Sequence, residues 1–151
     1  MFSIAAAAVL IASAFEARLA GSPPAEDPWR PGDVLSPKQL DRSLHGAKKP
    51  VVVSVGFEFL FKTSHIPGAV FKGSAKDAAG IDNLKAWAKN VDRKGEIVLY
   101  CGCCPWKECP NIRPAFAALK AMGFTRLKVM EIGQDFHTDW VKQGYPTEKG
   151  N

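Results

Sequence analysis

No apolar run near the start of this sequence is long enough to cross a bilayer. The N-terminal run from Phe2 to Ala14 falls short of the roughly 20 residues that a spanning helix needs, so no stable membrane span is expected in the mature protein. The sequence also lacks an internal repeat, which argues against a solenoid. Its net charge of +5 is spread among acidic residues rather than gathered in a stripe, so no nucleic-acid partner is expected.

Cysteine is absent from the first hundred residues and from position 110 onwards. All four cysteines fall within the segment Cys101-Gly102-Cys103-Cys104-Pro105-Trp106-Lys107-Glu108-Cys109. A disulfide framework for a small secreted domain would spread its cysteines along the chain to close long loops. The clustering therefore indicates chemistry rather than a covalent staple.

The N-terminal run also lacks lysine and arginine, leaving only the α-amino charge. It closes with Ala12-Ser13-Ala14, an A-x-A cleavage pattern, and we interpret residues 1–20 as a signal peptide or N-terminal anchor. Residues 21–35, rich in proline, are predicted to be a linker. Export is the expectation, to the periplasm or another extracytoplasmic site. A start further upstream, a weak signal and an uncleaved anchor remain open.

After the linker, strands and helices are predicted to alternate. A helix should begin at Pro37, because Ser36 and Gln39 have the spacing of a capping box. The apolar runs 51–55 and 96–100 are typical of strands buried on both faces of a parallel sheet. Further elements are predicted as a strand at 69–71, a helix at 78–91, a helix from an Asn111 N-cap to Gly123, a strand at 126–132 and a terminal helix at 135–143. This alternation indicates one α/β domain.

Cys101 directly follows the strand at 96–100, which places it at the carboxyl edge of the sheet, where open α/β folds bind ligands. The segment after it leads into a helix N-terminus, whose N–H groups and dipole favour an anion.

Three motifs surround this strand, loop and helix. HIPGA lies at His65 to Ala69, YC at Tyr100-Cys101 precedes a helix that ends in GF, and W-x3-GYP lies at Trp140 to Pro146. In this order the sequence resembles the rhodanese, or sulfurtransferase, family. The resemblance implies a rhodanese-like α/β fold over residues 36–147, with a mainly parallel sheet flanked by helices on both faces and a tail at 148–151.

The chain departs from the family pattern at three places. Nine residues separate Cys101 from Asn111, more than the family's loop usually has. The first family strand commonly ends in Asp-x-Arg, whereas this chain has Ser54-Val55-Gly56. The glycine pair before the last helix is reduced to Gly133.

The resemblance implies that the Cys101 thiolate takes sulfur from thiosulfate or a related small anionic donor. It would pass the sulfur from a persulfide to cyanide or to a thiol of a small molecule or protein. Lowering a thiol pKa by about two units takes roughly 2.7 kcal/mol, and a helix dipole supplies about 0.3 to 1 kcal/mol. We therefore expect the remainder from N–H groups of the substrate-binding loop or from a nearby cation. The loop residues are Gly102, Cys103, Cys104, Pro105, Trp106 and Lys107, and the available cations are Lys107 and Arg113. No cofactor and no metal are expected.

The other cysteines leave alternatives open. Cys103, Cys104 and Cys109 could be resolving thiols, or two of them could form a structural disulfide. The whole cluster could instead bind a soft metal such as copper(I) or zinc, or act as a thiol–disulfide redox module. A phosphatase or arsenate reductase is disfavoured, because the loop arginine that its Cys-x5-Arg motif requires is replaced by Lys107 when counted from Cys101.

Overall fold

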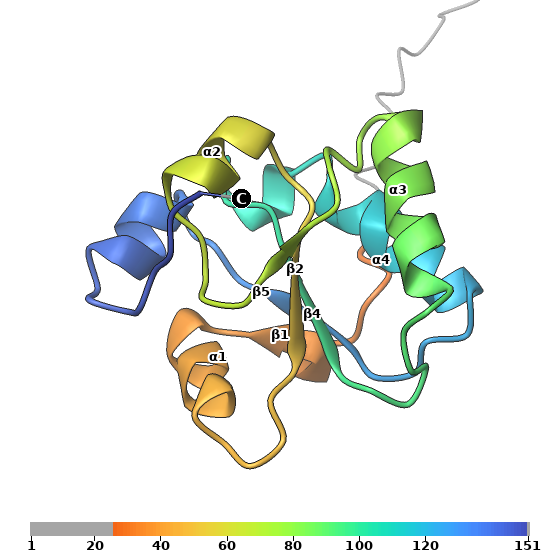
Figure 1. Cartoon of the computed structure of the whole chain (residues 1–151), viewed down its shortest axis with the longest axis horizontal. Coiled ribbons are helices and arrows are strands. Elements are labelled where there is room, and N and C mark those ends of the chain that lie inside the picture. Colours follow the sequence, from red (N-terminus) through yellow and green to blue (C-terminus); the bar gives the residue numbers. More distant parts are fainter. Residues whose placement is uncertain (1–25, 151) are drawn as a thin grey trace, which may run out of the picture.

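The computed structural model describes residues 26–150, which form a parallel sheet with helices on both faces (Figure 1). The five strands lie in the order β1-β5-β4-β2-β3, and every pairing is parallel. The strands are β1 (Val34–Leu35), β2 (Val51–Ser54), β3 (Val70–Phe71), β4 (Ile97–Tyr100) and β5 (Leu127–Met130). The helices are the 3₁₀ turn η1 (Pro31–Asp33), α1 (Pro37–Leu44), α2 (Glu58–Thr63), α3 (Ala78–Ala88), the 3₁₀ turn η2 (Trp106–Glu108), α4 (Ile112–Ala121) and the π-helix η3 (His137–Val141). The predicted α/β class and parallel sheet are confirmed.

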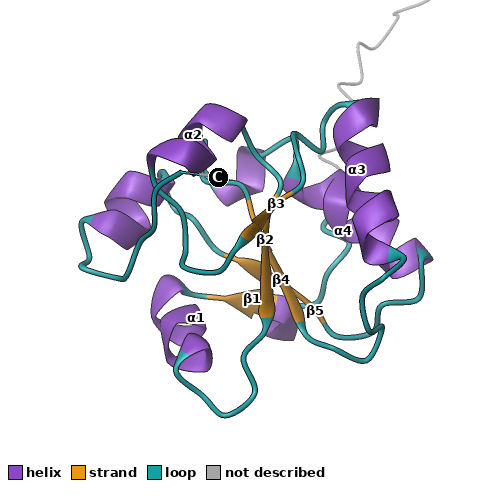
Figure 2. Cartoon of the chain, in the orientation of Figure 1, coloured by secondary structure: helices purple, strands orange, loops and turns teal. Residues whose placement is uncertain are grey.

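Two cores lie on opposite faces of this sheet, as Figure 2 shows by the helices on either side of the strands. Alternate residues of β4 point to each core: Ile97 and Leu99 pack with α3 and α4, and Val98 and Tyr100 pack on the α1 and η3 side. β4 is buried along its whole length, which explains its unbroken apolar sequence. Cys101, the next residue, belongs to the α3 and α4 core.

The helices begin where local chemistry favours them. The capping box before α1 is confirmed, since the Ser36 hydroxyl accepts from the Gln39 N–H and the Gln39 side chain accepts from the Ser36 N–H. α2 was not predicted, because it has only six residues and its N-cap, Phe57, makes no side-chain cap hydrogen bond. The predicted terminal helix forms as η3, a single π-helical segment shorter than the predicted range.

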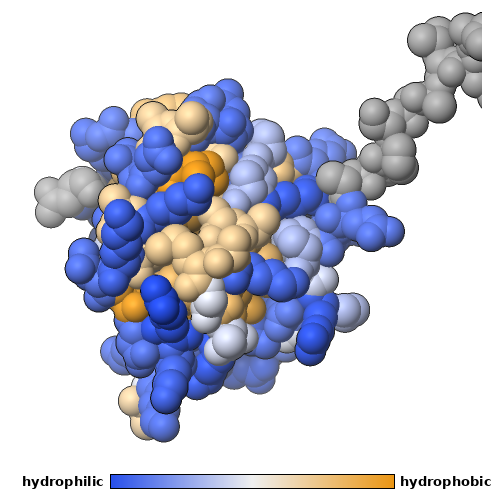
Figure 3. Space-filling model, turned by 90° about the vertical axis from the view of Figure 1, so that its right-hand side faces the viewer, coloured by the Kyte–Doolittle hydropathy of each residue, from blue (hydrophilic) through white to orange (hydrophobic). Residues whose placement is uncertain are grey.

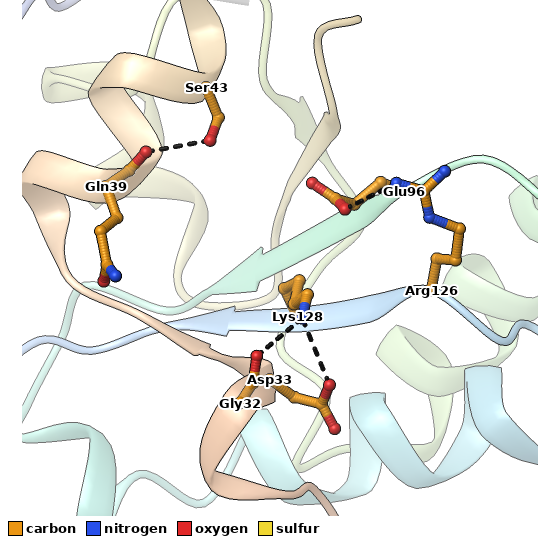
Figure 4. A network of polar contacts seen from close by, with 7 residues as sticks. All are labelled: Gly32, Asp33, Gln39, Ser43, Glu96, Arg126 and Lys128. Carbon is orange, nitrogen blue, oxygen red and sulfur yellow. Dashed lines mark hydrogen bonds and ion pairs between the residues drawn. The ribbon is translucent and has the colours of Figure 1, made fainter.

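The predicted linker at 21–35 is wrong for the part that the structure describes. Trp29 is buried against Trp106 and Phe116, with ring centroids 5.6 and 5.5 Å away. β1, at the end of the predicted linker, pairs with β5 and so completes the sheet. Lys128 of β5 donates to the carbonyl of Gly32 at 2.7 Å and pairs with Asp33, which fixes η1 to the sheet (Figure 4). Proline-rich composition suggested a linker, but these long-range contacts add the segment to the domain.

The predicted tail at 148–151 is also ordered up to Gly150. Glu148 and His65 exchange two backbone hydrogen bonds of 2.9 and 2.8 Å, and the Gly150 N–H donates to the Lys62 carbonyl. The domain therefore extends beyond both predicted boundaries. The predicted signal segment at 1–20 lies outside the described residues.

The outer face on the side of α3 has an apolar centre bordered by hydrophilic residues (Figure 3). None of the helices in residues 26–150 combines the length and apolar character needed to cross a membrane.

Candidate active site

The four cysteine thiols meet beyond the carboxyl end of β4. The Cys101 sulfur lies 3.2 Å from that of Cys103, which in turn lies 3.0 Å from that of Cys104. The Cys109 sulfur lies within 4.8 Å of the Cys101 and Cys103 sulfurs. All four are free thiols, with Cys101 and Cys109 buried and the other two half-buried. The structure thus brings together the cysteines that the sequence analysis singled out.

Asn111 holds Cys101 from the helix side. Its side-chain NH₂ donates to the Cys101 sulfur at 3.2 Å. Its carbonyl oxygen accepts from the Ser74 hydroxyl and the Lys76 N–H, both at 2.9 Å, so the amide is held in one orientation. The sequence analysis expected Asn111 to cap α4, but its side chain makes no cap hydrogen bond because these contacts occupy it. Asn111 is fully buried, so its amide needs these partners.

Gly56 allows the loop after β2 to approach Cys101. A Cβ atom at Gly56 would lie 2.5 Å from the Cys101 carbonyl oxygen and 2.9 Å from its sulfur. Only glycine fits this contact. Gly56 is one of the departures from the family pattern, and its close approach to Cys101 is the physical reason.

Cys101 and Cys109 form an interacting pair of thiols whose pKa values are shifted in opposite directions. The S–H···S interaction with Cys101 lowers the pKa of Cys109, and the N–H groups of Asn111 and Ile112 at the start of α4 lower it further. The same interaction raises the pKa of Cys101, and burial adds to this. Burial also raises the pKa of Cys104. The N–H groups at the start of α4 therefore favour an anion on Cys109, the partner of Cys101 in this pair.

This arrangement predicts an early thiolate titration. As the pH rises, the reduced protein should lose the first proton of the Cys101–Cys109 pair below the ordinary cysteine pKa of about 8.5. Ultraviolet thiolate absorbance measures this step, and Cys109→Ser should remove it. An unchanged early step in Cys109→Ser would contradict the assignment. Cys104→Ser removes only the smallest of the interactions that lower the pKa of Cys109, so it should move the step far less.

Of the two cations predicted to support the thiolate, Arg113 is engaged elsewhere in the described chain. Arg113 pairs with Asp27 at 2.6 Å and lies over the Trp29 ring, 5.4 Å from its centroid. Lys107 is exposed, and no ion pair joins it to any group among residues 26–150. This ion pair of Arg113 has no local signature in the sequence, because its carboxylate partner lies 86 positions away.

Only some of the predicted loop N–H groups are shown to interact with the Cys101 sulfur. The Cys103 N–H interacts with the Cys101 sulfur and lowers the pKa of that thiol, against the larger opposing effects. The Trp106 N–H donates to the Ile132 carbonyl at 2.8 Å and is used there. Pro105 has no N–H, and the Trp106 ring packs on Trp29. The donors at the Cys101 sulfur thus include the Cys103 amide, which was predicted, and the Asn111 side chain, which was not.

A groove of about 410 Å³ lies beside the cluster, between α2 and η3. Gly102 and Cys103 line its floor, and Asp135 and Lys142 are among the charged groups on its wall. Gly102 has a φ of 85°, and a Cβ there would come 3.0 Å from that of Phe136, so glycine is required at this turn. The groove gives the half-buried Cys103 a face toward solvent.

Comparison with known proteins places the fold and the cysteine loop together in one family. The family model described as Rhodanese-like domain matches residues 36–135, and the chain therefore belongs to the rhodanese-like domain family. No protein among the curated sequences is similar enough to match the chain.

Solved structures agree on the fold. The rhodanese-like domain of an Anabaena protein is 20% identical over 78% of this chain and 79% of that chain, with a TM-score of 0.57. A Bacillus halodurans protein is 22% identical over 76% and 75% of the two chains, with a TM-score of 0.59. A thiosulfate sulfurtransferase from Pseudomonas aeruginosa is 24% identical with a TM-score of 0.59, over 78% of this chain and 19% of that one. These likenesses confirm the rhodanese-like fold, and family membership relates the chain to sulfurtransferases.

Proposed function

We propose that the protein is a sulfurtransferase that carries sulfane sulfur as a persulfide on Cys101. The observation that carries the proposal is the position of the Cys101 sulfur, beyond the end of β4 and 3.2 Å from the NH₂ group of Asn111. The buried, immobilised amide can donate to a sulfur anion without reorganising. Membership in the rhodanese-like family supports the same chemistry.

The neighbouring thiolate provides the base that Cys101 needs. As the Cys101 sulfur attacks the outer sulfur of thiosulfate, its proton passes to the Cys109 thiolate. The new S–S bond forms on Cys101, the S–S bond of thiosulfate breaks, and sulfite leaves with the electron pair. The products are a Cys101 persulfide anion, a neutral Cys109 thiol and sulfite, so atoms and charge balance.

An acceptor thiolate completes the cycle. It attacks the terminal sulfur of the persulfide, becomes a persulfide itself and leaves Cys101 as a thiolate, which recovers its proton from Cys109. The groove floored by Gly102 and Cys103 is the approach that we propose for the donor and acceptor. Its size is at the lower end of the range for small-molecule sites, which suits a small thiol or a protruding protein cysteine.

The experiment is mass spectrometry of the reduced protein after incubation with thiosulfate and alkylation. We expect a gain of one sulfur atom per chain. Trypsin cleavage after Lys107 separates Cys109 from the other three cysteines, and fragmentation of the larger peptide distinguishes Cys101 from Cys103 and Cys104. Sulfur on Cys101 supports the proposal. A chain that gains none, or gains it only on another cysteine, refutes it.

Export also stays a proposal. An exported protein would hold the four free thiols in an oxidising compartment, where disulfides form readily. Fractionation of cells, with N-terminal sequencing of the mature chain, tests it: cleavage after Ala14 or nearby supports export, and an intact chain in the cytosol contradicts it.

A further inference from the structure

Three of the four thiols form a compact triad. The sulfurs of Cys101, Cys103 and Cys109 all lie within 4.8 Å of one another, and no histidine or carboxylate joins them as a fourth ligand in residues 26–150. Cys104 falls outside the triad, although its sulfur contacts that of Cys103. Cys101 comes from the strand end and Cys109 from just before α4, so the rigid sheet and helix hold two corners in place.

The triad has the dimensions of a trigonal metal site. With thiolate–metal bonds of about 2.3 Å, three sulfurs around one ion lie roughly 4.0 Å apart. The present Cys101–Cys103 separation of 3.2 Å would have to widen by less than 1 Å, and Cys103 lies in the loop between β4 and η2. The backbone fold would not need to change.

The surroundings select a soft cation. Cys101 and Cys109 are only 6% and 1% exposed, and the nearby Arg113 is already paired with Asp27. Metal binding releases the thiol protons, and the bound cation then supplies the positive charge that buried thiolates need. Thiolate sulfur favours copper(I), whereas a structural zinc site requires a fourth ligand that the triad does not offer.

We propose that Cys101, Cys103 and Cys109 bind one copper(I) ion in trigonal thiolate coordination. This proposal does not depend on the proposed sulfur transfer. Copper binding and sulfur transfer would nevertheless compete at Cys101, because a thiolate bound to copper is no longer free to attack. Bound copper(I) would therefore inhibit persulfide formation.

The test is an anaerobic titration of the reduced full chain with copper(I) against a chromophoric copper(I) chelator, without any sulfur donor. We expect one tightly held ion per chain and thiolate-to-copper charge-transfer absorption in the ultraviolet. Loss of a partner that only orients a ligand costs 10–100-fold in affinity, so Cys103→Ser and Cys109→Ser should each weaken binding by at least about that much. Cys104→Ser is the matched control: its sulfur contacts Cys103 without belonging to the triad, so it should weaken binding less than either triad variant.

X-ray absorption spectroscopy of the wild-type complex keeps the proposal testable if a serine variant fails to fold. Three sulfur neighbours at about 2.3 Å support it. A count of two or four sulfur neighbours would overturn it. In the titration, the absence of saturable binding would do the same, as would a Cys104→Ser variant that binds as weakly as Cys109→Ser. Because no sulfur donor is present, failure here leaves the proposed transferase activity unaffected.

Discussion

Replacing Cys101 with serine is expected to lower sulfur transfer from thiosulfate to cyanide by more than about 1,000-fold, because a hydroxyl is a far weaker nucleophile and cannot hold a persulfide. Serine retains the size and hydrogen-bonding capacity of cysteine, so Asn111 keeps a partner and the fold should persist. Thiocyanate formation measures the effect. A circular dichroism spectrum and an unfolding curve close to those of the wild type would show that the loss is chemical.

Cys104→Ser is the matched control for this experiment as well. Cys104 lies in the same loop, but its contact is with Cys103 rather than with Cys101, so the variant should keep most of the activity. If Cys101→Ser remains active while Cys104→Ser does not, the nucleophile is Cys104. If neither variant loses activity, Cys103 or Cys109 must carry the sulfur.

The parts of the fold that sequence predicted well are those with strong local signals. The apolar run at 96–100 predicted β4 because a strand between two helical layers is buried on both faces. The pair Ser36 and Gln39 predicted the start of α1 because a capping box is a local contact. β1 has only two residues and exists through its pairing with β5, nearly a hundred positions along the chain. Such a strand has no local signature.

The candidate site was also predicted only where the sequence carries a local signal. The strand-end position of Cys101 followed from the order of elements, and the clustering of thiols followed from their spacing. The ionisation of the cluster did not follow, because it depends on which sulfur the N–H groups of α4 reach, and they reach Cys109. The role of Asn111 depends on Ser74 and Lys76, which come from a distant loop. The residues that support Cys101 are therefore determined by tertiary contacts, which have no local signal in the sequence.

The largest effect on stability is expected at Trp140, in the core that covers the sheet face opposite α3 and α4. Its side chain is fully buried and packs on Phe136 and Tyr145, with ring centroids 6.1 and 4.8 Å away. Its indole N–H donates to the Pro146 carbonyl at 2.8 Å, which fixes the chain after η3. Trp140→Ala removes the ring and this hydrogen bond, and should lower the free energy of unfolding by about 3 to 5 kcal/mol.

Urea unfolding of the reduced protein measures this change, and two further variants separate its causes. Trp140→Phe keeps much of the apolar volume but leaves the Pro146 carbonyl without its donor, so it should cost about 1 to 3 kcal/mol. Phe59→Ala, at a side chain that is 66% exposed, should change stability by less than about 0.5 kcal/mol. A loss in Trp140→Ala no larger than in Phe59→Ala would mean that η3 contributes little to the fold. The wall of the groove beside Cys103 would then lack the rigid support that the proposed approach of donor and acceptor requires.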